Sequence, residues 1–512
     1  MEKDLEWNTR TIQTKYQTPV INVRRGLPSK TLPGLGPQNP PRLLFIHGLS
    51  ASKSAMMQMA VEMAQSGADC YLMDLPGHGA SRERFTWEAS RRAVQEISEW
   101  ILQLPESNPN GSPNIDFFLI GHSLGGGLAI EAAQENTGVT GVIAISPAAV
   151  PVRRNSPPHL LILYGENDFP FVQRGAAYLF EATTCVAIHP LNDLRRWDTP
   201  GGSHRLVVLK QTEHSGSLFL PQAYREIKMW INRTTGNSAL DFHAHSSPEA
   251  RAVIKALLCI AALAAWFPSF SLLSQVLLGQ PSQDKASTEI PLTTAEPPDS
   301  PATGFQIYGA YAVFSFLTLI ILKGFNPWVR LHLLGGGFLC GFLSIIGVAL
   351  FVWKTPSVQA LDLSRRYVFC GLAGLLLLVL YPFEMISNHF ANLELTFLRA
   401  WRFPIITLCT LPFFLWDEWV FRTFLKLEGN WHLVIHFLST RLILVASLML
   451  GFFLLNNAQF LILLILPGLA IMSLLNWIGS GWVFSRTQSC AASALFSSLV
   501  TGWIFSAFFA QV

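Results

Sequence analysis

The chain has 512 residues, with 36 Lys and Arg against 33 Asp and Glu and a net charge of +3, and half of its residues are hydrophobic. This length exceeds what one hydrophobic core supports, so we expect at least two domains. The balanced charge, with no basic patch and no nucleic-acid motif, argues against a nucleic-acid partner. Most of the seven cysteines lie in apolar runs. The sequence therefore indicates no disulfide framework, no metal site and no cofactor.

The charged residues divide the chain into two parts. Residues 1–251 hold 23 Lys and Arg and 23 Asp and Glu, whereas the remainder holds 13 and 10. The first residues are charged and lack the apolar core of a signal peptide, which predicts that the N-terminal part stays in the cytoplasm. We predict a domain over residues 1–240, a linker over 241–253 and a membrane domain over 254–512.

Strand and helix patterns alternate through the first domain. The predicted strands cover 42–46, 69–73, 117–120, 141–145, 159–164 and 205–209, and the predicted helices cover 55–65, 89–104, the residues after 123 and 221–233. Such alternation builds a mostly parallel sheet covered by helices on both faces, an α/β fold. Ligands bind these sheets at the carboxyl ends of the strands.

A G-x-S-x-G turn follows the third predicted strand, at Gly121, Ser123 and Gly125. Between a strand and a helix, such a turn strains its serine and exposes the hydroxyl group. The N-terminus of the following helix adds unpaired N–H groups, which stabilise negative charge. Ser123 is therefore the predicted nucleophile.

A nucleophilic serine needs a histidine to accept its proton and a carboxylate to orient that histidine. The predicted strand 159–164 leads to Asp168, and the predicted strand 205–209 leads to His214. Both residues therefore follow the carboxyl end of a strand, as Ser123 does. We predict a triad of Ser123, Asp168 and His214.

Other residues compete for these roles. Glu166 is the rival acid, and His189 and His204 are rival bases that precede the last strand. His122 is expected to pack beside the nucleophile. Structural roles are expected for three residues of the early loops, His47, Asp74 and His78.

Residues 20–235 resemble the α/β-hydrolase superfamily. Four features carry the resemblance. The first is the G-x-S-x-G turn around Ser123, which we call the elbow, and the second is an H-G pair after the first predicted strand. The others are a D-x-P-G-H-G-x-S loop that begins at Asp74 and the chain order serine, aspartate, histidine. The resemblance implies an oxyanion hole made by the backbone N–H groups of Leu49 and Leu124. The link at 146–158 is short and rich in proline, so we expect a hydrolase fold without a cap domain.

The second half contains eight apolar runs of the length that crosses a bilayer, about 20 residues each. They cover roughly 254–278, 305–323, 330–353, 367–387, 403–423, 434–455, 458–478 and 491–510. A segment rich in Pro, Ser, Thr and acidic residues, 280–303, is predicted to be an exposed loop. Its acidity, with Arg251 and Lys255 before the first run, favours a cytoplasmic N-terminal domain. We predict an all-α, multi-pass integral membrane domain.

Ionisable residues end the fifth apolar run. Asp417, Glu418 and Arg422 resemble the E-E-x-x-x-R motif of the CAAX-protease and Abi intramembrane family, and His436 is the candidate for its later histidine. The resemblance implies a possible site at these four residues. The first acid is aspartate and the last apolar run lacks the family's histidine. The second half of this chain therefore resembles a degenerate member of that family. Alternatively, Glu418 and Arg422, one helical turn apart, simply neutralise each other.

Three hypotheses follow. The first is a membrane-tethered serine hydrolase that cleaves a lipid or amphiphilic ester through an acyl-enzyme. The second is an intramembrane peptidase with an appended hydrolase fold. The third is a membrane scaffold or transporter whose hydrolase fold is inactive. The complete Ser, Asp and His set favours the first.

Overall fold

The computed structural model describes residues 5–12, 15–16, 18–25, 40–104, 115–188, 196–199, 203–236, 240, 248–278, 301–356, 365–389, 393–424, 430–454 and 460–512. The chain forms two compact units. The first comprises Met1–Cys259, Ile386–Glu394 and Ala510–Val512, and the second comprises Ile260–Met385 and Leu395–Phe509.

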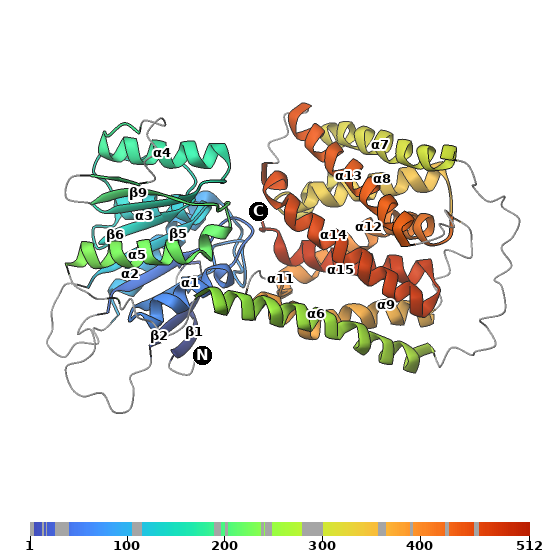
Figure 1. Cartoon of the computed structure of the whole chain (residues 1–512), viewed down its shortest axis with the longest axis horizontal. Helices are drawn as coiled ribbons and strands as arrows, with labels where there is room; N and C mark the ends of the chain where they lie inside the picture. Colours follow the sequence, from blue (N-terminus) through green and yellow to red (C-terminus); the bar gives the residue numbers. More distant parts are fainter. Residues whose placement is uncertain are drawn as a thin grey trace, which may run out of the picture. The chain divides into compact units, whose positions relative to one another are not determined.

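A nine-stranded sheet forms the centre of the first unit (Figure 1). Its strands are β1 (Leu5–Ile12), β2 (Thr18–Arg25), β3 (Arg42–Ile46), β4 (Asp69–Met73), β5 (Phe117–His122), β6 (Gly141–Ile145), β7 (Leu160–Gly165), β8 (Arg196–Asp198) and β9 (His204–Leu209). The order is β1-β2-β4-β3-β5-β6-β7-β9-β8. The strands from β4 to β9 in this order are parallel, and β1, β2 and β8 pair antiparallel.

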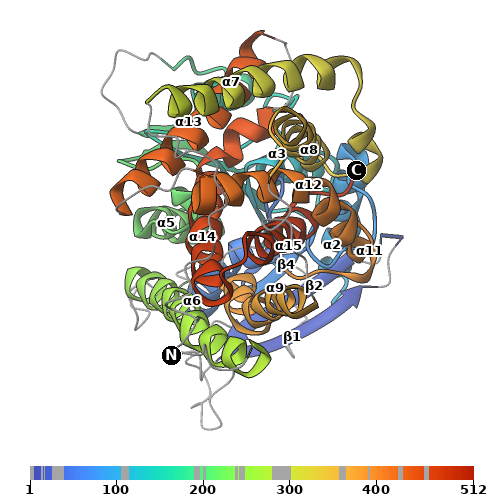
Figure 2. The same cartoon turned by 90° about the vertical axis from the view of Figure 1, so that its right-hand side faces the viewer.

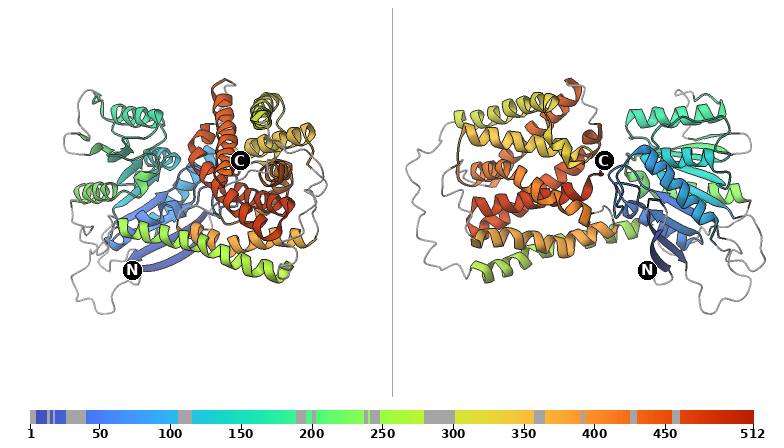
Figure 3. Two further views of the ribbon diagram at one scale, coloured as in Figure 1. Left: turned by 45° about the vertical axis from the view of Figure 1, so that its right-hand side comes forward. Right: turned by 180° about the vertical axis from the view of Figure 1, so that it is seen from behind.

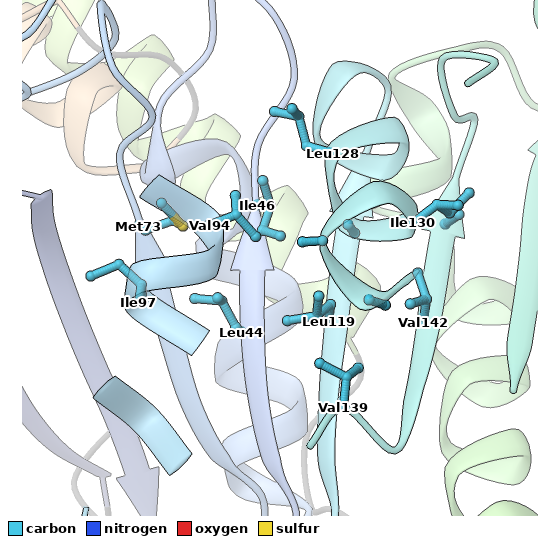
Figure 4. Packing of buried hydrophobic residues seen from close by; sticks show 14 of the residues in the cluster. Leu44, Ile46, Met73, Val94, Ile97, Leu119, Leu128, Ile130, Val139 and Val142 are labelled. Atoms are coloured by element: carbon cyan, nitrogen blue, oxygen red, sulfur yellow. The ribbon is translucent and has the colours of Figure 1, made fainter. Parts of the chain in front are cut away.

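Helices cover both faces of this sheet. They are α1 (Lys53–Gln65), α2 (Trp87–Leu102), α3 (Leu124–Glu135), α4 (Pro170–Thr184) and α5 (Pro221–Thr235), with a short 3-10 turn at Gly216–Leu218. One buried cluster joins the sheet to α2, α3 and α4, and a second joins it to α1 and α5. Figure 4 shows part of the first cluster, where Val94 and Leu128 approach Leu44, Ile46 and Leu119 of the strands. Alternate residues of each strand thus pack into the two clusters on opposite faces of the sheet.

The second unit is helical. Its elements are α6 (Pro248–Leu278, shared with the first unit), α7 (Pro301–Gly324), α8 (Gly336–Trp353), α9 (Arg365–Leu378), α10 (Glu384–His389, also shared with the first unit), α11 (Phe397–Ala400), α12 (Arg402–Trp419), α13 (Asn430–Leu454), α14 (Phe460–Thr487) and α15 (Cys490–Phe508). A 3-10 turn lies at Pro327–Leu331, and π-helical segments continue α9 at Val379–Phe383 and α12 at Val420–Phe424. In the described chain, eight helical segments are long and apolar enough to cross a membrane.

The helical unit has a buried centre and two apolar flanks. α15 is the most buried of the eight segments and packs against α12 (Figure 2). α7 and α8 lie side by side on the opposite flank from α6 and α9 (Figure 3).

Most predicted elements of both halves are present. The fold class is confirmed: an α/β-hydrolase sheet without a helix between β6 and β7, together with helices of membrane-spanning length. The sequence interpretation missed β1, β2, β8 and α4. Of the predicted linker, 241–247 lies outside the described residues, and 248–253 is already α6. The predicted loop lies outside the described residues up to 300, and 301–303 belongs to α7.

Candidate active site

The elbow joins β5 to α3 through a strained serine. Ser123 has φ 55° and ψ −118°, a conformation that non-glycine residues rarely adopt. It caps the N-terminus of α3 and remains partly exposed. A Cβ on Gly121 would lie 2.1 Å from the Gly125 oxygen, and one on Gly125 would lie 2.2 Å from the Ile46 oxygen. Both glycines are therefore required for the tight packing that holds Ser123 in place.

The predicted acid and base are in contact. Asp168 follows β7, His214 follows β9, and His214 Nδ1 donates a hydrogen bond to Asp168 Oδ1 at 2.9 Å. The Phe169 N–H donates to the same oxygen at 2.8 Å. Burial alone would raise the pKa of Asp168, but its interactions with His214 and the Ser146 hydroxyl hold that pKa below the ordinary value. Asp168 is therefore ionised at neutral pH and keeps the Nδ1 proton on His214.

His122 connects the elbow to His214, the predicted base. Its Nε2 donates to the His214 carbonyl oxygen at 3.1 Å, and the two imidazole rings lie 5.0 Å apart between centroids. Burial, with a smaller effect of His214, lowers the pKa of His122 to about 3. The ring is therefore neutral at physiological pH. Because His122 precedes Ser123 directly, this contact places the backbone of His214 beside the elbow.

Two serines that the sequence interpretation missed contact Asp168 and His214, the predicted acid and base. Ser146 follows β6 with φ 46°, is fully buried, and lies 3.3 Å from Ser217 between the two hydroxyl oxygens. Ser217 donates to the His214 carbonyl oxygen at 2.8 Å. The position of Ser146 just after a parallel strand was the available sequence signal, because functional side chains gather at that edge.

The loop after β3 lies against Ser123, the predicted nucleophile. A Cβ on Gly48 would lie 3.2 Å from the Ser123 Cβ, so Leu49 is close to the elbow. Among the described residues, neither the Leu49 nor the Leu124 N–H donates a backbone hydrogen bond. Leu124 is the first residue of α3, where the helix leaves N–H groups unpaired. Both amides are thus available to an oxyanion.

Residues 38–179 match the sequence model of the family described as serine aminopeptidase, S33. The sheet of the N-terminal domain has the α/β-hydrolase fold, and the matched residues supply its strands from β3 to β7. The chain is 30% identical over 116 residues to the Xenopus laevis protein named monoacylglycerol lipase abhd6-B, covering 22% of this chain and 32% of that protein. It is 31% identical over 108 residues to the Bacillus subtilis protein named phospholipase YtpA, covering 20% and 39%. The chain thus spans about a third of the length of these curated relatives.

Among solved structures, a predicted CIB-like hydrolase from Thermoplasma acidophilum matches with a TM-score of 0.33 and 17% identity, over 45% of this chain and 98% of that chain.

The rival residues of the hydrolase domain have other partners. Glu166 Oε2 accepts from the Gln211 N–H at 3.0 Å. His204 is the first residue of β9 rather than part of the preceding loop, at the opposite end from His214, and His189 lies outside the described residues.

The early-loop residues hold turns. The Leu75 N–H donates to His47 Nε2 at 3.1 Å, and the Ala80 N–H donates to Asp74 at 3.0 Å. His78 Nδ1 donates to the Pro76 carbonyl oxygen at 2.9 Å.

The candidate residues of the helical unit form separate pairs. Glu418 Oε2 lies 3.1 Å from Arg422 Nε, as one-turn spacing predicts. Asp417 pairs with Arg441 of α13, which the sequence interpretation did not include. His436 hydrogen-bonds to Tyr308 of α7. Among the described residues there is no group of three His, Cys, Asp or Glu side chains with the spacing of a metal site. The proposed peptidase-like site stays a prediction.

Proposed function

We propose that the N-terminal domain is a serine hydrolase that cleaves carboxylic esters of lipids or other amphiphiles. Ser123 is the nucleophile, His214 the general base and Asp168 the acid that orients it. The observation that carries this proposal is the 2.9 Å hydrogen bond between His214 and Asp168, formed beside the strained Ser123 elbow. In this fold that arrangement is the one that activates serine.

The proposed mechanism proceeds through an acyl-enzyme. Ser123 Oγ attacks the ester carbonyl carbon while His214 Nε2 accepts the hydroxyl proton. Asp168 fixes the Nδ1–H tautomer and balances the imidazolium charge. The Leu49 and Leu124 amides stabilise the oxyanion, an interaction worth about 3–4 kcal/mol per donor in comparable enzymes. His214 then protonates the leaving alcohol, and water attacks the acyl-enzyme with His214 again as base.

An amphiphilic substrate is supported by two observations. The relatives carry the names monoacylglycerol lipase and phospholipase. In addition, eight helical segments of the described chain could span a membrane. We infer a multi-pass membrane protein whose hydrolase domain is on the cytoplasmic side, as the basic residues before the first span favour.

Active-site labelling tests the nucleophile. A fluorophosphonate should label the full-length chain, and Ser123→Ala should abolish the label. Ser54→Ala, which removes a partly exposed serine of α1, is the matched control and should label as wild type. Persistent labelling of Ser123→Ala would refute the assignment.

Lipid profiling tests the substrate class. Membranes containing wild-type protein should lose a long-chain acyl ester that membranes containing Ser123→Ala retain. In parallel, long-chain monoacylglycerols in vesicles should be cleaved faster than short water-soluble esters. Equal turnover of both would contradict the amphiphile assignment while leaving the serine hydrolase assignment intact.

A further inference from the structure

The helical unit contains a cavity of about 500 Å³. This volume falls within the roughly 300–1,000 Å³ of small-molecule sites. Side chains of α8, α12, α13, α14 and α15 line it, and most are apolar, including Leu339, Phe342, Leu444, Val445, Leu466 and Leu469. The cavity could therefore accommodate an alkyl chain.

A charge-balanced pair forms part of the lining. Arg441 Nη1 donates to Asp417 Oδ1 at 3.0 Å, and Nη2 donates to Oδ2 at 2.5 Å. The remaining guanidinium nitrogen, Nε, donates to Ser473 Oγ at 3.1 Å, and Tyr311 donates to Asp417. Each nitrogen of Arg441 and each oxygen of Asp417 thus has a partner within the protein. A charged ligand head would find no free counter-charge in this pair.

Asn476 supplies an open hydrogen-bond acceptor. It lines the cavity, is 6% exposed, and donates through Nδ2 to the Ser497 carbonyl oxygen at 3.2 Å. Within the described chain its Oδ1 has no hydrogen-bond partner. A buried amide oxygen without a donor is costly, so such groups in native proteins usually have a partner. A hydroxyl group on a ligand would provide one.

Several lining residues face outward from the bundle. Leu438 and Leu442 of α13 are 58% and 69% exposed, and Ile471 of α14 is 61% exposed. In helices that span a membrane, exposed leucine and isoleucine contact acyl chains. The cavity is therefore accessible from the hydrocarbon phase, the compartment where an amphiphile's chain already resides.

We propose that this cavity binds a single-chain amphiphile with an uncharged, hydroxyl-bearing head, such as a monoacylglycerol or its ether analogue. The chain lies against the apolar lining, and a head hydroxyl donates to Asn476 Oδ1. The site goes beyond the proposed hydrolase function and requires no turnover at Ser123.

Photolabelling tests the site. The probe is an alkylglycerol ether carrying a diazirine and an alkyne on its chain, which an esterase cannot cleave. In the full-length protein we expect crosslinks in peptides of α13 and α14, and unlabelled alkylglycerol should compete with them. Leu469→Trp, which fills the cavity, should reduce competed labelling at least fivefold. Leu475→Trp is the matched control, because Leu475 lies on the same helix, is 45% exposed and does not line the cavity.

A variant of Asn476 and a second probe test the proposed recognition of the head group. Asn476→Leu should reduce labelling several-fold, and a fatty-acid probe with the same chain should label less than the glycerol ether. Equal labelling by the two probes would overturn the proposed head recognition. Labelling that unlabelled alkylglycerol does not reduce would overturn the proposed cavity site. Equal labelling of Leu469→Trp and Leu475→Trp would overturn it as well.

Fluorophosphonate labelling and gel filtration of every variant separate the two proposals. A folded chain that labels at Ser123 without competed crosslinks in α13 or α14 would refute the cavity alone. Competed crosslinks in a folded chain that the fluorophosphonate does not label would refute the hydrolase proposal alone.

Discussion

Asp168→Asn isolates the charge of the proposed catalytic acid. The hydrogen bonds from His214 Nδ1 and the Phe169 N–H both end on Asp168 Oδ1, at 2.9 and 2.8 Å. An amide oxygen at that position can accept both hydrogen bonds and keep the imidazole in its orientation. An amide turned the other way donates to Nδ1 and favours the wrong tautomer, which only adds to the loss. What the substitution removes is the negative charge that balances the imidazolium formed during attack by Ser123.

The size of the effect follows from this geometry. Two unit charges about 4 Å apart interact by about 4 kcal/mol at an effective dielectric constant of about 20. Losing that stabilisation in the transition state should lower kcat about 10³-fold, since each 1.36 kcal/mol is a factor of about ten. Asp168→Ala also removes the acceptor, worth a further ~1 kcal/mol, and should lower kcat about fivefold more.

Rates of ester hydrolysis and of fluorophosphonate labelling measure the effect in the full-length protein. Glu166→Gln is the matched control, because it neutralises a carboxylate two residues away that accepts from the Gln211 N–H. We expect it to stay within about threefold of wild type. A near-normal rate for Asp168→Asn, or an equal loss in Glu166→Gln, would refute the assignment of Asp168.

Two further predictions concern stability. Lys228 of α5 and Glu62 of α1 form a buried ion pair with 2.7 Å between Nζ and Oε1, so Lys228→Met should lower the free energy of unfolding by about 3–5 kcal/mol. Acid should also destabilise the hydrolase domain through His122, whose pKa is about 3 when buried against an ordinary value of 6.5. In the unfolded chain His122 binds a proton below pH 6.5, whereas in the folded chain it does so only below about pH 3. The free energy of unfolding therefore falls as the pH drops through this window. This effect should lower the free energy of unfolding by about 2 kcal/mol at about pH 5 relative to about pH 7.5, which thermal unfolding can measure.

Matched variants test both interpretations. Lys228→Met combined with Glu62→Met should recover most of the lost stability, because it leaves no unpaired buried charge; a double variant as unstable as the single one would contradict the argument. His122→Gln should weaken the pH dependence, whereas substitution of His432, exposed at the start of α13, should leave it unchanged. Identical pH profiles for wild type and His122→Gln would exclude His122 as the source.

The sequence predicted the central strands well because their burial is nearly complete. The ranges of β4 and β6 were predicted to the residue, since both are short apolar runs. β1 was missed because it is an edge strand whose side chains are mostly exposed and polar, so it lacks a hydrophobic pattern. α4 had a readable signal, with buried Val172, Ala176 and Phe180 at helical spacing.

The contacts that support the proposed triad depend on sheet register, which one sequence does not reveal. β5 pairs with β6 so that His122 lies opposite Ile145, and the Ser123 N–H donates to the Ile145 oxygen at 2.9 Å. That register places Ser146, the next residue, beside the elbow. In the sequence, Ser146 is only one serine in a proline-rich link. Its role as a neighbour of Asp168 emerges when the parallel strands are aligned.

In the helical unit, too, the sequence identified a contact within one helix but not a contact between helices. Sequence spacing identified the Glu418–Arg422 pair, because those residues are one turn apart on one helix. It did not identify Arg441, which reaches Asp417 from α13 through tertiary packing. Asp417 and Glu418 are neighbours in the sequence, yet each pairs with a different arginine. The proposed head recognition rests instead on Asn476, which no motif included, so Asn476 is the residue to test first.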